Sequence, residues 1–246
     1  MKRKRRVKKR VLNVLLVIFL LVFLYSSYNA LHILLNRNSN NKEVKKIQEE
    51  VITNKKEIEE VKEDEELPEL TLDFKKLNEI NSDTVGWIRI NNTNINYPIV
   101  QAKDNDYYLK HSFYKRYNEN GWIFLNSINS SSFNDLNTVV FGHDTRSRSM
   151  FSDLIKLYDG LLGDNIPITI YTEQETYHYK TFAIFLTEEN DNEYLKNYLS
   201  TDSITKAIKN SKYDFKTAVL ASDNILTLQT CYHSPKQKVI LLAVRT

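Results

Sequence analysis

The chain begins with a basic segment that is followed by a long apolar one. The apolar segment "VLNVLLVIFLLVFLYSSYNA" covers residues 11–30, and Asn13 is the only polar interruption in its first fifteen residues. As a helix it would rise about 30 Å, the thickness of a bilayer core. A cleaved signal peptide is the alternative, but the run is long and "YSSYNALH" offers no good small-x-small cleavage site. The pattern favours an uncleaved transmembrane anchor.

The basic segment predicts the orientation of this anchor. Lys or Arg fills every position from Lys2 to Arg10 except Val7. Such clusters stay on the cytoplasmic side of a membrane. We therefore expect residues 1–10 to be a cytoplasmic tail, residues 11–30 to be the anchor, and everything after Leu35 to lie outside the cell.

A densely charged segment follows the anchor up to about Glu69. Its sparse apolar residues recur at roughly heptad spacing, but Asn54 occupies one of the matching positions. They are Val44, Ile47, Val51, Ile58 and Val61. A short amphipathic helix is compatible with this pattern, and the density of Lys and Glu fits a solvated spacer equally well. We interpret residues 31–70 as an extracellular spacer that Pro68 closes.

From residue 71 onward the pattern becomes that of a folded domain. Leu72, Phe74, Leu77 and Ile80 have helical spacing. Eight short β-branched or alternating runs follow, separated by polar turns. They are "GWIRI", "NINYPIVQ", "GWIFLN", "NTVVFGH", "NIPITIYT", "TYHYKTFAIFLT", "NILTLQTC" and "KVILLAVRT". Eight strands in this length predict a mostly β domain, an eight-stranded closed barrel with a helix at its N-terminal side.

Helical spacing returns once, between the sixth and seventh runs. The segment "DNEYLKNYLSTDSITKAIKNSKYDF" carries apolar residues first in residues 194–199 and then in residues 204–208. This spacing predicts a helix inserted between strands 6 and 7.

Charge argues against a nucleic-acid partner. The formal net charge is +3, and without the eight charges of the basic tail the remainder has a net charge of −5. A nucleic-acid-binding domain would carry its basic groups on the folded part of the chain.

The candidate chemistry lies at the ends of two predicted strands. Cys231 is the single cysteine, and it ends the run "ILTLQTC" in a domain that we place outside the cell. An unpaired thiol is usually absent there unless its chemistry is used, and the alternative is a buried, inert thiol. His143 ends the run "NTVVFGH". Its neighbour Asp144 is a poor orienting partner, because adjacent side chains diverge.

The remaining histidines are expected to be structurally ordinary. They are His32, His111, His178 and His233. No pair has the spacing of a zinc hydrolase, and one cysteine excludes a multi-thiolate site. We expect no metal and no organic cofactor.

Three stretches together resemble class B sortases, the membrane-anchored cysteine transpeptidases of Gram-positive bacteria. "TLQTC" resembles their TLxTC nucleophile motif, and "VVFGHDTRSRSMFSDL" resembles the segment of their catalytic histidine. "GWIRINNTNINYPIVQAKDNDYYLKHSF" resembles their opening strands. The resemblance covers residues 71–246 and implies a sortase-type barrel as the catalytic domain.

The resemblance implies a two-step acyl transfer. Cys231 would attack a threonine carbonyl in the C-terminal sorting motif of a surface protein and form a thioacyl enzyme. His143 would protonate the leaving amine and then deprotonate an incoming amine. That amine belongs to the cross-bridge of peptidoglycan or to its lipid-linked precursor, so the outcome is a protein attached to the cell wall.

One position departs from the family pattern. Sortases carry an arginine near the start of the final strand, and the position that resembles it here is Lys238, within "QKVILLAV". Arg245 lies seven positions later, so in a regular strand the two side chains point to opposite faces. We assign the role of the arginine to Lys238.

Two other functions fit the same residues. A barrel without the arginine could be a non-catalytic module that binds sorting-signal peptides. A hydrolytic cysteine peptidase would release surface proteins, because water would resolve the thioacyl enzyme instead of an amine.

Overall fold

The structure is a computed structural model that describes residues 9–54, 68–145, 148–161, 167–234 and 236–246. Most of the predicted cytoplasmic tail and residues 55–67 of the predicted spacer, with Ile58 and Val61, lie outside the described residues. The chain forms two compact units, one that extends to Glu43 and one that runs from Val44 to Thr246.

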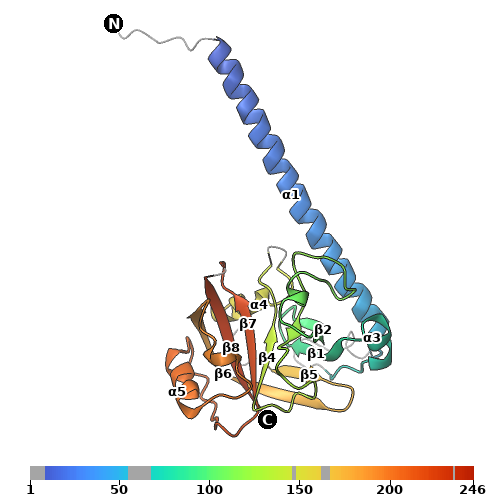
Figure 1. Cartoon of the computed structure of the whole chain (residues 1–246), viewed down its shortest axis with the longest axis vertical. Helices are drawn as coiled ribbons and strands as arrows, with labels where there is room; N and C mark the ends of the chain where they lie inside the picture. Colours follow the sequence, from blue (N-terminus) through green and yellow to red (C-terminus); the bar gives the residue numbers. More distant parts are fainter. Residues whose placement is uncertain (1–8, 55–67, 146–147, 162–166, 235) are drawn as a thin grey trace. The chain divides into compact units, whose positions relative to one another are not determined.

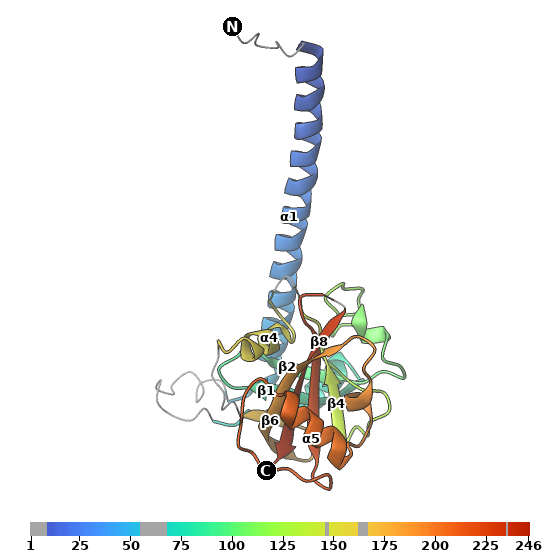
Figure 2. The same cartoon turned by 90° about the vertical axis from the view of Figure 1, so that its left-hand side faces the viewer.

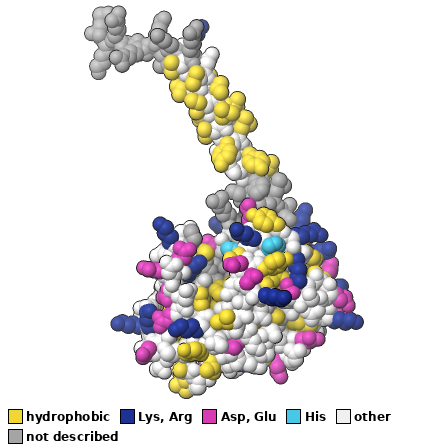
Figure 3. Space-filling view, viewed as in Figure 1, with side chains coloured by type: hydrophobic (Ala, Val, Ile, Leu, Met, Phe, Trp, Pro, Cys, Tyr) yellow, Lys and Arg dark blue, Asp and Glu magenta, His cyan; other side chains and the backbone are white. Residues whose placement is uncertain are grey.

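The first unit contains most of helix α1, which spans Lys9–Val51. No glycine or proline interrupts the helix, so nothing in the sequence breaks its hydrogen-bond ladder. Residues Val11–Leu31 have a mean hydropathy of 2.3, and none of this stretch is buried within the structure. Figure 3 shows the apolar side chains gathered on this stretch. By length and composition it can cross a bilayer, which is compatible with the predicted anchor.

The second unit begins with the C-terminal end of α1. Ile47 and Val51 lie one helical turn apart and are fully buried in the hydrophobic core. Ile52, just after the helix, forms an isolated β-bridge with Leu72. This part of the predicted spacer is therefore packed rather than solvated, because its apolar positions share one face of the helix.

Helix α3 spans Phe74–Ile80, where the sequence predicts a helix next to the barrel. The Asp73 side chain caps it by accepting a hydrogen bond from the Lys76 backbone N–H at 2.9 Å. Leu77 is its fully buried residue. After the helix, the Asn81 amide donates to the Tyr108 hydroxyl and to the Phe113 carbonyl, which ties the helix end to the loop after β2.

All eight predicted strands are present and close into one barrel. The order around the barrel is β1-β2-β3-β4-β7-β8-β6-β5. The pairs β2–β3 and β4–β7 are parallel, and the other pairs are antiparallel. The strands are β1 (Thr84–Ile90), β2 (Asn96–Val100), β3 (Phe124–Leu125), β4 (Asn137–Phe141), β5 (Ile168–Tyr171), β6 (Thr176–Glu188), β7 (Ile225–Cys231) and β8 (Gln237–Arg245).

Strand β7 has one face in each of two apolar cores. Leu226 and Leu228 belong to the large core inside the barrel, whereas Ile225 belongs to a second core on the outside. This outer core ends before the end of the strand, where Gln229 and Cys231 are only half-buried. The strand therefore has a firmly held body and an accessible C-terminal end.

The predicted insertion between β6 and β7 supplies the cover of the outer core. Helix α5 (Thr201–Asn210) lies against the outside of the barrel beside β6, as Figures 1 and 2 show. Its Ile204 and Ala207 are buried in the outer core. The helix starts later than the apolar pattern indicates, because Ser200 caps it by accepting from the Ser203 N–H. The earlier residues form only a 3-10 turn, η2 (Glu193–Leu195).

A further helix, α4 (Ser152–Tyr158), follows the histidine segment and was not predicted. Leu154, Ile155 and Leu157 are buried beneath it. Asp153, which is 2% exposed, anchors it. One oxygen of Asp153 accepts from the backbone and side-chain N–H groups of Asn94 at 2.6 and 2.9 Å. The other pairs with Lys156 at 2.6 Å.

Candidate active site

The adjacent strands β4, β7 and β8 bring Cys231, His143 and Lys238 to the same end of the barrel. Cys231 is the last residue of β7, and its direct partner on β8 is Lys238. On the other side, Phe141 of β4 pairs in parallel with Gln229, and the Gly142 N–H donates to the Gln229 carbonyl at 3.1 Å. His143 follows Gly142, just past the end of β4, and lines the same pocket as Cys231. Directly opposed residues of neighbouring strands share a face of the sheet.

Cys231 has a cation as its neighbour. Its thiol is free and half-buried, and the Lys238 ammonium group donates to Sγ at 3.6 Å. The register explains this contact, because the two residues are directly paired on antiparallel strands. A positive charge therefore lies where a thiolate or an oxyanion would carry negative charge.

The imidazole of His143 is held by a backbone carbonyl. Its Nε2 lies 3.0 Å from the oxygen of Leu109, the last residue of the 3-10 turn η1 (Tyr107–Leu109). A carbonyl only accepts, so we assign the hydrogen to Nε2, and the lone pair of the neutral ring is then on Nδ1. Burial lowers the pKa of His143, and the charge of Lys238 lowers it further, against the opposing effects of Leu109 and Asp144.

Gly121 leaves the space in which the His143 ring sits. A Cβ at this position would lie 2.8 Å from the Cδ2 atom of His143 and 2.5 Å from the Tyr108 carbonyl oxygen. The residue also has a φ of +56°, which favours glycine. Only glycine fits between η1 and the histidine, and the sequence alone gave no sign of this.

Asp144 does not orient His143 through a hydrogen bond. The histidine bonds instead to the Leu109 carbonyl. Burial raises the pKa of Asp144. Its role at His143 is therefore electrostatic, as expected for side chains that diverge from adjacent positions.

Arg245 is engaged elsewhere. Its guanidinium donates to the Phe133 carbonyl and to the Tyr179 hydroxyl, and it stacks over the Tyr177 ring at 4.0 Å. Lys238, not Arg245, is the cation beside Cys231.

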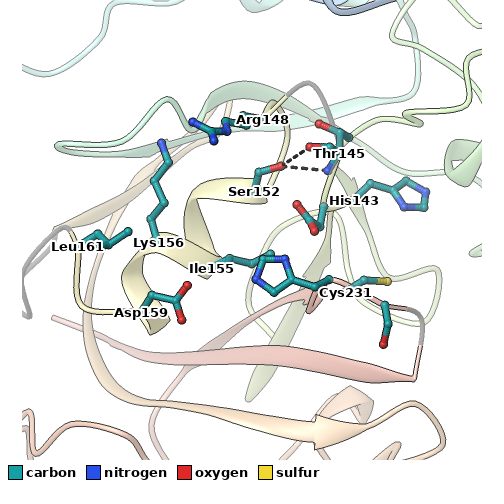
Figure 4. Close-up of a pocket in the computed structure, with 12 residues that line it drawn as sticks. His143, Thr145, Arg148, Ser152, Ile155, Lys156, Asp159, Leu161 and Cys231 are labelled. Carbon is teal, nitrogen blue, oxygen red and sulfur yellow. Dashed lines mark hydrogen bonds between the residues drawn. The ribbon is translucent and has the colours of Figure 1, made fainter. Parts of the chain in front are cut away.

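A pocket of about 730 Å³ opens beside Cys231 and His143. Figure 4 shows these two side chains at one end, with Lys156 and Leu161 toward the other. Helix α4 and the loop after Cys231 form its walls. His233, expected to be an ordinary loop residue, lines the pocket, as does Arg148, which the sequence did not single out. Among the described residues, no group of three His, Cys, Asp or Glu side chains could hold a metal ion.

A closed barrel with cysteine, histidine and a cation at the ends of adjacent strands is the architecture of a thiol acyltransferase of the sortase class. The family description "Sortase domain" matches residues 88–246. Sortase B of Listeria monocytogenes is 35% identical over 164 residues, which cover 65% of this chain and 67% of that protein.

Solved structures of sortase B are also similar to this chain. Clostridium perfringens sortase B is 31% identical with a TM-score of 0.64, over 71% of this chain and all of that one. Sortase B of B. anthracis in complex with AAEK2 is 30% identical with a TM-score of 0.68, over 85% of this chain and 96% of that one. The chain belongs to the sortase family, and these relatives identify it as a class B sortase. Members of this family are cysteine transpeptidases of the cell surface.

Proposed function

We propose that this protein joins surface proteins to the cell wall through a thioester on Cys231. The observation that carries the proposal is that Cys231 is paired with Lys238 at the ends of β7 and β8, while His143, just past the end of the adjacent β4, lines the same pocket as Cys231. Cys231 lies where the apolar cover of the barrel ends, so a peptide can reach it. Residues 71–246 are the proposed catalytic domain, residues 11–30 the membrane anchor and residues 1–10 a cytoplasmic tail.

In the first step, the Cys231 thiolate attacks the carbonyl carbon of a threonine in a C-terminal sorting motif. The Lys238 ammonium, 3.6 Å from Sγ, stabilises the negative charge that develops. The peptide bond after the threonine then breaks, and protonated His143 gives its Nδ1 proton to the leaving amine. The acyl group remains on sulfur as a thioester.

In the second step, an amine of peptidoglycan or of its precursor attacks the thioester carbon. His143, now neutral, takes the proton of this amine at Nδ1 while its Nε2–H stays bonded to Leu109. An amide bond forms and the Cys231 thiolate leaves. A thioester preserves the acyl-transfer energy for the amine as long as water reacts more slowly.

The test is to incubate the full chain in detergent with a pool of candidate sorting peptides and to detect an acyl adduct on Cys231 by mass spectrometry. Cys231→Ala is the control. We expect an adduct that disappears when an amine is added, with a new amide as product. Loss of the adduct as free acid would instead identify a hydrolytic peptidase. A folded protein that binds the peptides but forms no adduct would identify a non-catalytic binding module.

A further inference from the structure

The 3-10 turn η1 carries the carbonyl that bonds to His143, so the position of this turn is part of the site. Nε2 of His143 lies 3.0 Å from the Leu109 oxygen. A shift of this carbonyl would lengthen or bend the hydrogen bond, and both changes weaken it. Whatever fixes η1 therefore also fixes the imidazole.

Tyr108, the middle residue of η1, is held at both its backbone and its side chain. The Trp122 backbone N–H donates to its carbonyl at 2.9 Å. Its ring is fully buried, and the hydroxyl donates to Oδ2 of Asp83 at 2.7 Å and accepts from the Asn81 amide at 3.0 Å. Leu109 is the next residue along the chain, so these anchors lie one peptide unit from the carbonyl at the active site.

The two partners of the Tyr108 hydroxyl are themselves held in place. The Asn81 side chain donates to the Phe113 carbonyl and accepts from the Asp83 backbone N–H, both at 2.9 Å. The Asp83 carboxylate pairs with Lys115 at 2.9 Å. Each hydrogen bond at the hydroxyl therefore ends on a group that has a further partner.

Burial of the ring alone would not give Tyr108 this fixed position. The hydrophobic effect is non-directional, so it does not resist a small movement of a buried ring along its own axis. Hydrogen bonds at the tip of the ring do resist it, because their strength depends on distance and angle. Burial also raises the pKa of Tyr108, so the hydroxyl stays protonated and keeps donating to Asp83.

We propose that Tyr108 and Asp83 are positioning residues for His143. They hold η1 so that the Leu109 carbonyl keeps a proton on Nε2, which leaves Nδ1 for the leaving and the incoming amine. Their effect passes through the Leu109 carbonyl rather than through a contact with substrate. The inference rests on the proposed function, because the role of His143 in acyl transfer belongs to it.

NMR of the His143 ring tests the proposal independently of activity. The full chain in detergent is labelled with ¹⁵N at its five histidines, and the spectrum of His143→Gln identifies the signals of His143. Burial lowers the pKa of His143 and the Leu109 hydrogen bond opposes this, so a weaker bond should lower the pKa further. The neutral ring should also lose part of its Nε2–H form, which brings the ¹⁵N shifts of Nδ1 and Nε2 closer together. The charged groups that act on the ring, Lys238 and Asp144, are the same in every variant compared.

Two variants break the same hydrogen bond from its two ends. Tyr108→Phe removes the hydroxyl and Asp83→Ala removes its acceptor, so both should lower the pKa of His143 and shift its ring signals in the same direction. The double variant should show no larger shift than either single one. Asp83→Asn keeps an acceptor oxygen and should stay close to the unchanged protein. The Asp83 side chain is 30% exposed, so the test does not depend on a change in the core alone.

The rate of thioester formation is the second measurement. We expect it to fall about tenfold in Tyr108→Phe and in Asp83→Ala, which is part of the effect of general acid catalysis. The peptide concentration that gives half of the maximal rate should stay the same, because neither change removes a contact with the peptide.

Tyr171→Phe is the matched control. Tyr171 is 4% exposed and its hydroxyl accepts from the Leu70 backbone N–H at 3.2 Å, so this variant also loses a buried, bonded hydroxyl. Its strand, β5, lies on the opposite side of the barrel from β4. The signals of His143 and the rate should not change. Unshifted signals in Tyr108→Phe and Asp83→Ala, or an equal shift in Tyr171→Phe, would overturn the proposal.

The outcome is separable from that of the proposed function. If the signals of His143 shift in both variants but the rate of thioester formation stays the same, Tyr108 and Asp83 do position the ring, and its proposed role in acyl transfer is wrong. If the unchanged protein forms the thioester and neither variant alters the ring signals, the transpeptidase stands and the positioning proposal fails.

Discussion

Lys238 stands next to the nucleophile at the position where the family pattern has an arginine. An arginine offers a planar fork of donors, whereas the lysine offers a single ammonium group on a flexible stem. The charge is preserved and lies 3.6 Å from Sγ of Cys231, but a bidentate hold on substrate oxygens is lost. The proposed site therefore keeps the positive charge beside the thiol but lacks the two fixed donors that an arginine would offer.

Substitution of Lys238 tests this difference. We expect Lys238→Arg to preserve or raise the rate of thioester formation, since it restores the fork. Lys238→Ala should lower the rate by roughly a hundredfold, the usual effect of removing one oxyanion donor. The rate is measured by mass spectrometry of the Cys231 adduct, and Lys236→Ala, at an exposed lysine just before β8, is the control. An unchanged rate in Lys238→Ala would show that the assignment is wrong.

Lys238→Ala should also change how the rate of thioester formation depends on pH. Burial and the Lys238 charge both lower the pKa of His143. Only the imidazolium can protonate the leaving amine, so this step is lost as the pH rises through that pKa. Without the charge of Lys238 the pKa should rise, and the loss should move to higher pH even though the rate falls. NMR titration of the His143 ring in the two proteins measures the direction.

Sequence alone predicts Cys231 and His143 as the reacting side chains but not the groups that contact His143. Cys231 and His143 could be found because each ends an apolar run and lies in a recognisable motif. The Leu109 carbonyl and Gly121 could not be found, because their roles depend on contacts with His143 that the fold brings together across 34 residues in the first case and across fewer in the second. Every residue also has a backbone carbonyl, so the residue type at position 109 does not indicate this contact.

At the scale of elements, the loop that follows the nucleophile is anchored to two other segments. The Tyr232 ring packs edge-on against Tyr158 of α4 at 5.4 Å, and its hydroxyl donates to Asp159. Lys212, just after α5, lies 4.1 Å from the centroid of the Tyr158 ring and 3.9 Å from Asp159. The end of β7, the end of α4 and the start of the segment after α5 meet at this cluster.

Removal of the Tyr232 side chain should slow thioester formation without removing a reacting group. Tyr232→Ala loses the aromatic packing, worth about 1 kcal/mol, and frees the backbone next to Cys231. We expect thioester formation to slow about tenfold, with a small loss of thermal stability, because catalysis is sensitive to misplacement of the nucleophile. Tyr232→Phe keeps the ring and should stay close to the unchanged protein in both measurements.

The control for Tyr232→Ala is Tyr117→Ala, at a tyrosine that is 69% exposed. It should alter neither the rate nor the stability. If Tyr232→Ala changes stability alone and leaves the rate of thioester formation intact, the cluster has a purely structural role.

The strands and the helices α3 and α5 could be predicted from sequence, whereas helix α4 could not. Each strand carries a β-branched or alternating run, and closure into a barrel gives every run a partner. The place of helix α4 depends on the contacts of Asp153 with Asn94, which lie far apart in the sequence. The burial of Ile47 and Val51 was also not predicted, because the many charged residues around them in the sequence are typical of a solvated spacer.

At the scale of the whole molecule, the sequence predicts that the basic tail and Cys231 lie on opposite sides of a membrane. The stretch Val11–Leu31 is apolar and exposed along its length, a state that water does not favour and that a bilayer does. Eight positive charges precede it, and they set the orientation. In the view of Figure 3, acidic and basic side chains are intermixed over the visible face of the second unit, so this face carries no comparable cluster of positive charge.

Membrane-impermeant maleimide tests this topology with Cys231 as the reporter, since the chain has no other thiol. We expect labelling on intact cells that express the protein, and none in Cys231→Ala. When Lys2→Cys is combined with Cys231→Ala, labelling should appear only after the membrane is permeabilised. A cleaved signal peptide would instead release labelled protein without residues 1–30 into the medium. Labelling of Cys231 only after permeabilisation would reverse the orientation and remove the peptidoglycan amine from its reach.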